Sequence, residues 1–122
     1  MTYGELLDGA LGILEYGDRQ NREGFAKGMI DLVLSELWDL NNRIRWMKDL
    51  EPLEEIPRCY DFKETIPYEE ELVRRDMVLG LVCRLVADEE DRSLHNFYSA
   101  EYEIAKRDHR DRTGMNVEDY YS

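Results

Sequence analysis

The chain has 122 residues, 43% hydrophobic and 36% charged, a balance typical of one globular domain and not of a disordered acidic segment. Its formal net charge of -12 argues against nucleic-acid binding through phosphates, because such binding needs a basic face that releases counterions. No segment approaches the ~18 apolar residues of a membrane span, and the first residues lack the features of a signal peptide. We therefore expect an intracellular protein with no membrane association.

The first half of the chain carries two helical patterns separated by a polar connector. Thr2 and Glu5 have the spacing of a capping box, and apolar residues at helical intervals follow to about Gly17. In the second pattern, apolar residues step by three and four from Phe25 to about Lys48. Because this pattern is apolar on more than one face, we expect the second helix to be the spine of the domain and to pack against two neighbours.

A long connection follows, in which the helical period disappears. Residues 49–66 include two of the three prolines, and we expect an extended arm there. Residues 59–62, Cys-Tyr-Asp-Phe, fit either a short strand or plain extended chain. Pro67 suits the first turn of a helix, and the glutamates at 69–71 place negative charge at the positive end of its dipole. The third helix is therefore predicted to begin at Pro67.

The third helix is predicted to continue to Ala87. Apolar residues occupy nearly every face after Asp76, which indicates a central element surrounded by neighbours. Gly80 lies within this helix, where glycine lowers helix stability by about 1 kcal/mol relative to alanine. We expect the glycine to allow close packing against a neighbouring helix.

The fourth helix is predicted to follow the acidic turn at residues 88–91. The helix would end in the charged residues 106–112. One of its faces would carry Leu94, Tyr98, Tyr102 and Ala105, with Phe97 and Ile104 beside them. The last ten residues, TGMNVEDYYS, have no period. The sequence thus predicts a mainly α, four-helix bundle-like domain over residues 1–112, with an extended arm at 49–66 and a flexible C-terminal tail at 113–122.

Few residues indicate catalysis or metal binding. Cys59 and Cys83 lack CxxC spacing and a secretory context, so we expect free, buried thiols. His95 and His109 form no Glu-x-x-His pair, and structural or solvent-facing roles fit both.

Carboxylates on the second and third helices are a weak signal for a metal site. Glu36 and Asp39 lie one turn apart, as in all-helical nucleotide pyrophosphohydrolases, but no ExxE pair occurs on the partner helix. We therefore expect no cofactor and no enzymatic activity; a metal-dependent hydrolase stays a minor alternative.

Aromatic and basic residues point to protein contacts. Trp38 fits the core, whereas Tyr120 and Tyr121 at the chain end fit docking onto a partner. Three arginines end the fourth helix, where they meet the negative end of its dipole. These residues, Arg107, Arg110 and Arg112, could lie in solvent at the helix end, or they could contact the acidic face of a neighbouring subunit.

The order of these parts resembles the head-tail connector, or adaptor, proteins of tailed bacteriophages. The resemblance is carried by the opening MTYGELLDGALGIL, by the Ile-Pro step ahead of the acidic residues, by LGLVCRLVADEED and by NFYSAEYE. It spans most of the chain. The arm is shorter here than that family's pattern, which leaves open whether it forms a β-hairpin.

The resemblance implies a virion protein, made in the host cytoplasm, that forms a homo-oligomeric ring, usually of twelve copies, beneath the portal protein. The ring would extend the DNA channel, without sequence-specific DNA binding, and hold a downstream neck or tail completion protein. An acidic lumen would let DNA slide, because its phosphates find no cations there. The C-terminal residues that would dock on the portal are Met115, Val117, Tyr120 and Tyr121. The residues expected to contact neighbouring subunits or the tail are Tyr60, Phe62, Arg107, Arg110 and Arg112.

A different class of function also fits an acidic helical chain. A DNA mimic or regulatory protein would bind one basic partner through paired rows of carboxylates. Here the acidic residues cluster at helix starts and turns, which favours ordinary helix capping.

Overall fold

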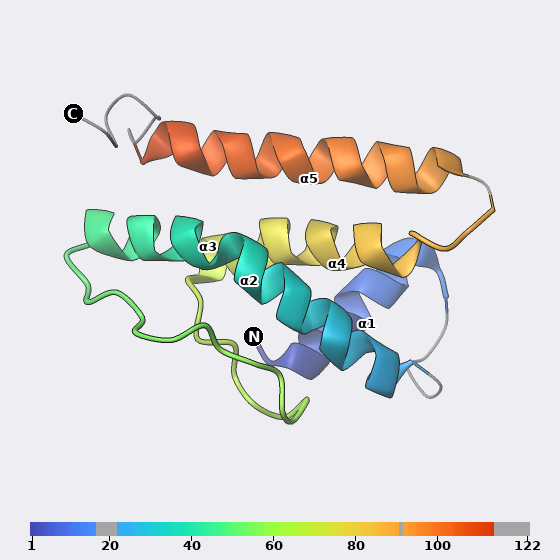
Figure 1. Cartoon of the computed structure of the whole chain (residues 1–122), viewed down its shortest axis with the longest axis horizontal. Coiled ribbons are helices and arrows are strands. Elements are labelled where there is room, and N and C mark those ends of the chain that lie inside the picture. The colour runs from blue at the N-terminus through green and yellow to red at the C-terminus, as the bar shows by residue number, and fades with distance from the viewer. Residues whose placement is uncertain (17–21, 91, 114–122) are drawn as a thin grey trace.

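The computed structural model describes residues 1–16, 22–90 and 92–113. Over these residues the chain is all-α and contains no β-strand, which confirms the predicted fold class. Four helices make up the bundle (Figure 1), and the third of them has three consecutive parts. The elements are α1 (Tyr3–Leu14), α2 (Glu23–Met47), the third helix formed by α3 (Glu70–Leu72), the π-helical segment η1 (Val73–Met77) and α4 (Val78–Leu85), and finally α5 (Arg92–Arg112).

The predicted capping box starts α1. The backbone N–H of Glu5 donates to Thr2 Oγ1 at 3.1 Å, and the Thr2 N–H donates to Glu5 Oε1 at 3.0 Å. Hydrogen bonding by Thr2, first through its backbone N–H, lowers the pKa of Glu5 below its ordinary value, because it favours the ionised carboxylate. The helix ends at Leu14, earlier than predicted, because Glu15 takes up the left-handed conformation, with φ at 58°.

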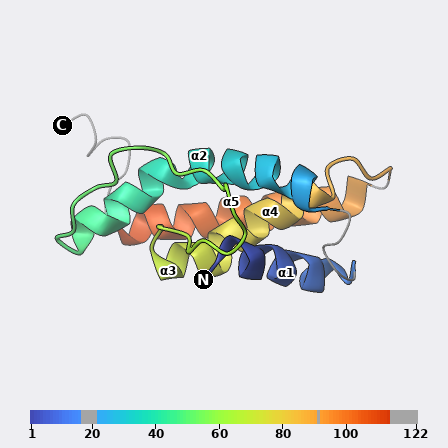
Figure 2. The ribbon, with the colours of Figure 1, turned by 90° about the horizontal axis from the view of Figure 1, so that it is seen from below.

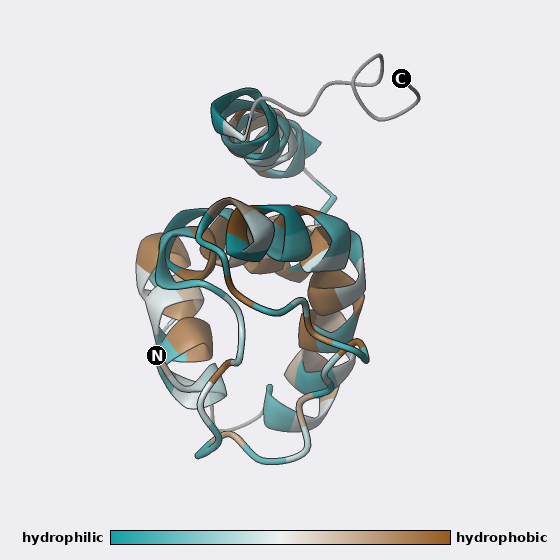
Figure 3. Ribbon diagram, turned by 90° about the vertical axis from the view of Figure 1, so that its left-hand side faces the viewer, coloured by the Kyte–Doolittle hydropathy of each residue, from teal (hydrophilic) through white to brown (hydrophobic). Residues whose placement is uncertain are grey.

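The third helix is the central element of the bundle, as its apolar faces predict. Its α4 part contacts α1, α2 and α5. Figures 2 and 3 show α1 and α2 on opposite sides of α4, with α5 as a separate layer above them. Because α2 packs against both the third helix and α5, the prediction of two neighbours for α2 is also confirmed.

The third helix begins at Glu70, so the prediction that Pro67 lies in its first turn is wrong. The residues before Glu70 are held extended by two contacts with α2. The Tyr68 hydroxyl donates to the Leu34 carbonyl at 2.5 Å, and the Glu69 N–H donates to Asn41 Oδ1 at 2.8 Å. Buried polar groups of α2 thus find partners in this extended segment and delay the start of the helix.

The connection between α2 and the third helix packs on the bundle as a loop without a strand. Three backbone hydrogen bonds tie it to the start of the chain: Tyr3 N to Glu64 O at 3.1 Å, Gly4 N to Phe62 O at 2.9 Å, and Ile66 N to Met1 O at 2.9 Å. The Cys59 N–H donates to Asp31 Oδ1 on α2 at 2.7 Å. The loop therefore bridges α1 and α2 on the side of the bundle away from α5 (Figure 3).

The predicted close packing at Gly80 is confirmed. A Cβ atom at this position would lie 2.9 Å from Cζ of Tyr102 on α5 and 3.1 Å from Cγ1 of Val33 on α2. The absence of a side chain at Gly80 is therefore what lets the buried Tyr102 ring reach the α4 backbone.

A buried contact between a carboxyl group and an imidazole also joins α5 to the third helix. Asp76, in η1, is 0% exposed, and His109 is 5% exposed. His109 Nδ1 lies 2.9 Å from Asp76 Oδ1 and 3.0 Å from Oδ2, and its single hydrogen is donated to Oδ2, so Oδ1 lacks a hydrogen-bond donor. Burial raises the pKa of Asp76, and the contact with His109 opposes this rise. Burying the Asp76 carboxylate therefore costs free energy that His109 partly offsets.

A glycine-to-alanine pair tests the packing at Gly80. Gly80→Ala should lower the free energy of unfolding by about 1–3 kcal/mol, because the new methyl group overlaps the Tyr102 ring. Gly9 lies on the exposed side of α1, with no atom within 4 Å of its Cβ position. Gly9→Ala should therefore raise the free energy of unfolding by about 0.5–1 kcal/mol. Urea denaturation measures both changes, and equal effects at the two sites would contradict the packing argument.

The buried pair predicts a pH-dependent stability loss. His109→Leu should lower the free energy of unfolding at neutral pH by about 3 kcal/mol or more, because the buried Asp76 carboxylate then lacks a partner. The burial-raised pKa of Asp76 means that the folded variant takes up a proton more readily than the unfolded chain as the pH falls. The loss relative to the wild type should therefore shrink toward acidic pH.

Urea denaturation at several pH values measures this difference. Asp108→Asn is the control, because Asp108 and its partner Arg75 form a 3.0 Å pair with side chains 44% and 41% exposed, which should be worth only about 0–1 kcal/mol. A loss in His109→Leu that stays constant with pH would rule out the charged-pair explanation.

Candidate functional site

The outer helix α5 buries only one side. Its buried residues Tyr102, Ala105 and His109 face the bundle. The Tyr102 hydroxyl donates to Glu36 Oε1 on α2 at 3.2 Å, and burial raises the pKa of this hydroxyl well above its ordinary value. These contacts fix which flank of α5 faces solvent.

The exposed flank of α5 carries three large apolar side chains. Leu94, Phe97 and Ile104 are 40%, 56% and 45% exposed. The spacing of these residues places them along one flank of the helix, which we call the α5 flank. Phe97 is supported by an edge-on contact with the half-buried Tyr98, at 5.1 Å between ring centroids. Leu94 was predicted on one face with Tyr98, Tyr102 and Ala105; it lies at the exposed edge of that face.

The opposite side of α5 is polar and faces α2. Lys106 and Arg110 line a cavity of about 160 Å³ together with Asp39 and Arg43 of α2. The α5 flank therefore lies on the side of α5 away from α2.

A second apolar surface lies between α2 and the loop, and we call it the α2 groove. The groove has a volume of about 490 Å³ and is lined by Leu32 of α2 and by Ile56 and Pro57 of the loop, among others. Leu32 and Ile56 are 49% and 44% exposed. Arg58 and Asp31 form an ion pair, at 3.6 Å, within its lining. The groove and the α5 flank thus face different directions on the molecule, since the loop lies away from α5 (Figure 1).

The C-terminal end of α2 forms a third exposed apolar area. Trp46, Met47 and Leu50 are 65%, 52% and 42% exposed. The C-terminal end of α5 lies at the same end of the bundle (Figure 1). Trp38, by contrast, is half-buried against the core, in agreement with its prediction.

The predicted contact residues separate into exposed and buried ones. Tyr60 is 71% exposed on the loop, whereas Phe62 is only 9% exposed and lies under the Lys27 ammonium group, 5.4 Å from its ring centroid. Phe62 therefore belongs to the core of the protomer. The three arginines at the end of α5, Arg107, Arg110 and Arg112, are exposed. The predicted docking residues Met115, Val117, Tyr120 and Tyr121 lie outside the described residues.

The three glutamates that begin the third helix are each paired within the chain. Glu69 lies 2.9 Å from Lys48 Nζ, Glu70 lies 2.6 Å from Arg74 Nε, and Glu71 lies 2.8 Å from Lys48 Nζ. The hydrogen bond from Arg74 lowers the pKa of Glu70. Among the described residues, no group of three or more His, Cys, Asp and Glu side chains could hold a metal ion. Glu69 is the N-cap residue of the third helix, and Glu70 and Glu71 lie in its first turn, as the helix-start interpretation expects.

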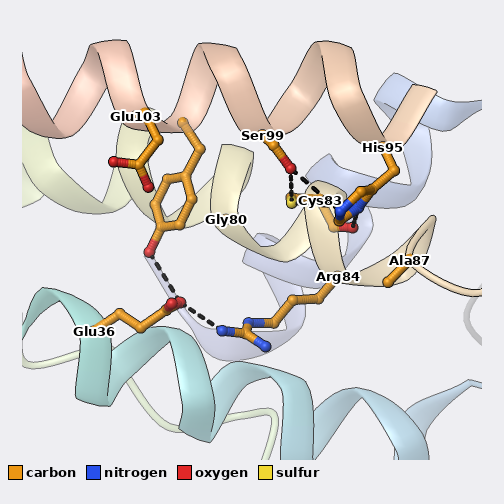
Figure 4. Close-up of a pocket in the computed structure, with 9 residues that line it drawn as sticks. Glu36, Gly80, Cys83, Arg84, Ala87, His95, Ser99 and Glu103 are labelled. Atoms are coloured by element: carbon orange, nitrogen blue, oxygen red, sulfur yellow. Dashed lines mark hydrogen bonds and ion pairs between the residues drawn. The ribbon is translucent and has the colours of Figure 1, made fainter. Parts of the chain in front are cut away.

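Sequence reasoning missed two polar clusters that join α5 to the third helix. One is the Asp76–His109 pair. Two features of the sequence could have indicated it: a charged residue inside an apolar helix, and a histidine seven residues after Tyr102, which places both on the same face of α5. The other surrounds Cys83, which is free and half-buried, whereas Cys59 is free and fully buried as predicted. Cys83 borders a pocket of about 250 Å³ between α4 and α5 (Figure 4).

Over the described parts of the chain, no helix is long and apolar enough to cross a membrane. Comparisons with known protein families, with curated protein sequences and with solved structures found no match.

Proposed function

We propose that this chain is a head-tail connector of a tailed bacteriophage, a structural protein that forms a ring beneath the portal and links the capsid vertex to the neck and tail. The sequence resemblance supplies the identity of the assembly. The observation that carries the proposal is the presence of two separate exposed apolar surfaces, the α5 flank and the α2 groove, on one small protomer.

Two different surfaces are what a ring requires. In a closed ring each subunit presents one surface to the copy on one side and a different surface to the copy on the other side, whereas a two-fold dimer needs only one self-complementary patch. Exposed apolar side chains that gather in patches mark protein interaction sites. In the proposed ring, the α5 flank of one copy packs into the α2 groove of the next, and Phe97 and Leu32 become buried.

The charge distribution fits such an assembly. A net charge of -12 on each copy gives the ring a strongly acidic surface, which favours the free passage of DNA through its channel. The exposed arginines at the end of α5 would meet acidic side chains of a neighbour. Docking on the portal is assigned to residues 113–122, which follow α5 in the sequence. The C-terminal end of α5 lies at the end of the bundle that also exposes Trp46 and Met47.

The main alternative is an acidic DNA mimic. A mimic needs rows of unpaired carboxylates that imitate the spacing of phosphates. The glutamates that begin the third helix are instead paired with Lys48 and Arg74 inside the protomer. This pairing favours the structural role.

Quantitative mass spectrometry of purified virus particles tests the proposal directly. DNA-filled particles should contain this chain and the portal protein in near-equal copy number. Absence of the chain from particles would overturn the proposal and direct the search to a basic host partner.

A charge placed on the α5 flank should block assembly without unfolding the protomer. Phe97→Asp should lower incorporation into particles by about tenfold or more, because it removes the burial of one large apolar side chain at every subunit contact. Asn96→Asp is the matched control, since it introduces the same charge at the adjacent exposed position of α5. Incorporation is measured by mass spectrometry of particles, and circular dichroism checks the fold. Equal incorporation of both variants would remove the α5 flank from the interface.

The arginines at the end of α5 supply an independent test. Substituting Arg107 and Arg110 together by Glu should weaken ring formation, because like charges would then face each other between subunits. Substituting both by Gln should have a smaller effect, and high salt should reduce the difference between the two double variants. Normal assembly of the double Glu variant would show that these arginines form a solvated helix end.

A further inference from the structure

A cysteine, a serine and a histidine meet at the interface between α4 and α5. Cys83 Sγ lies 3.0 Å from Ser99 Oγ and 3.7 Å from His95 Nδ1, and Ser99 Oγ lies 3.4 Å from His95 Nε2 (Figure 4). His95 and Ser99 are four residues apart on α5, so both side chains face α4 together. All three side chains line the pocket of about 250 Å³.

The backbone of Cys83 decides which nitrogen of His95 carries the proton. His95 Nδ1 lies 3.2 Å from the carbonyl oxygen of Cys83. Because a carbonyl oxygen only accepts hydrogen bonds, Nδ1 of the neutral ring must be the protonated nitrogen, which leaves Nε2 as an acceptor. The Ser99 hydroxyl then donates to Nε2, and its oxygen accepts from the Cys83 thiol. The result is a chain of hydrogen bonds that runs from the thiol through the hydroxyl to the imidazole.

We propose that Cys83 is a reactive thiol whose proton passes through Ser99 to His95, and that it undergoes exchange with small, positively charged disulfides. The arrangement has the parts of an activated nucleophile, namely a nucleophile, a base, and a third group, here the Cys83 carbonyl, that orients the base. The thiolate would be stabilised by the Ser99 hydroxyl and by the nearby Nδ1–H of the imidazolium.

The net charge of the chain, rather than the pocket lining alone, favours a cationic partner. Each of the two carboxylates in the pocket lining is paired with a cation: Glu36 with Arg84 at 2.8 Å, and Glu103 with Lys106 at 2.7 Å. The chain as a whole carries a net charge of -12. A cationic disulfide should therefore be attracted to the pocket and an anionic one repelled.

The exchange balances without any further oxidant. The Cys83 sulfur attacks one sulfur of the disulfide, a new S–S bond forms to Cys83, and the original S–S bond breaks. The departing thiolate takes the proton that His95 received, so one disulfide and one thiol give one mixed disulfide and one thiol. Cys83 is oxidised and the departing half of the reagent is reduced.

The second cysteine is an internal control. Cys59 is 4% exposed, and burial raises its pKa to about 11. It lies in the loop, with no histidine among the groups that influence its ionisation. Cys59 should therefore remain almost unmodified while Cys83 reacts.

The experiment measures the rate at which cystamine modifies each cysteine of the folded full-length chain at pH 7, by quenching, digestion and mass spectrometry. Cys83 should react at least about tenfold faster than Cys59. Ser99→Ala and His95→Asn should each slow the reaction at Cys83 by about tenfold or more, because each breaks the path of the proton. Asn96→Ala, an exposed change on the same helix, should leave the rate unchanged, and circular dichroism verifies that every variant is folded.

Two outcomes would overturn the proposal. Modification of Cys83 no faster than that of Cys59 would show that the thiol is not reactive. Equal rates in the wild type, Ser99→Ala and His95→Asn would show that the proton does not pass through these residues. The anionic disulfide dithiodiglycolate tests the charge argument, since it should react more slowly than cystamine at low salt.

Discussion

The contact between α5 and α4 at Gly80 is the constraint on which the other features depend. A side chain at Gly80 would collide with the Tyr102 ring, so the buried ring, its hydrogen bond to Glu36 and the position of α5 all follow from one missing Cβ. Because α5 is seated there, one flank of it is left in solvent, and His95 and Ser99 are brought to Cys83. Both the proposed assembly surface and the proposed reactive thiol are consequences of how closely these two helices approach.

The features that could be predicted from the sequence are those set by residues close together in the chain or by an apolar pattern. The capping box of Thr2 and Glu5 and the central position of the third helix depend on neighbours along the chain or on an apolar pattern. The start of the third helix was missed because the hydrogen bonds of Tyr68 and Glu69 join residues 34 and 28 positions apart, a separation that no local pattern reports. The Asp76–His109 contact spans 33 positions and was missed for the same reason.

The candidate assembly surfaces were predicted only in part. Tyr60 and the arginines that end α5 are exposed, as contact residues must be, but Phe62 is in the core because the loop folds back onto α1 and α2. Helical periodicity grouped Leu94 with Tyr98, Tyr102 and Ala105 on one face, but could not show that Leu94 lies at the exposed edge of that face. Only the positions of neighbouring helices determine where the buried stripe ends. The α2 groove depends on the loop packing against α2, which the irregular sequence of residues 48–69 does not encode in any periodic form.

The buried polar groups explain why α5 has one defined position. An apolar interface alone tolerates sliding and rotation, since hydrophobic contact is not directional. His109 must meet Asp76, and Tyr102 must meet Glu36, at fixed points along α5, and any shift of the helix would leave a buried charge or hydroxyl without a partner. The free-energy cost of burying the Asp76 carboxylate is therefore offset only in one register of α5, the one in which His109 reaches it. A ring built on the α5 flank needs that register, because every copy must present Phe97 and Ile104 in the same place to its neighbour.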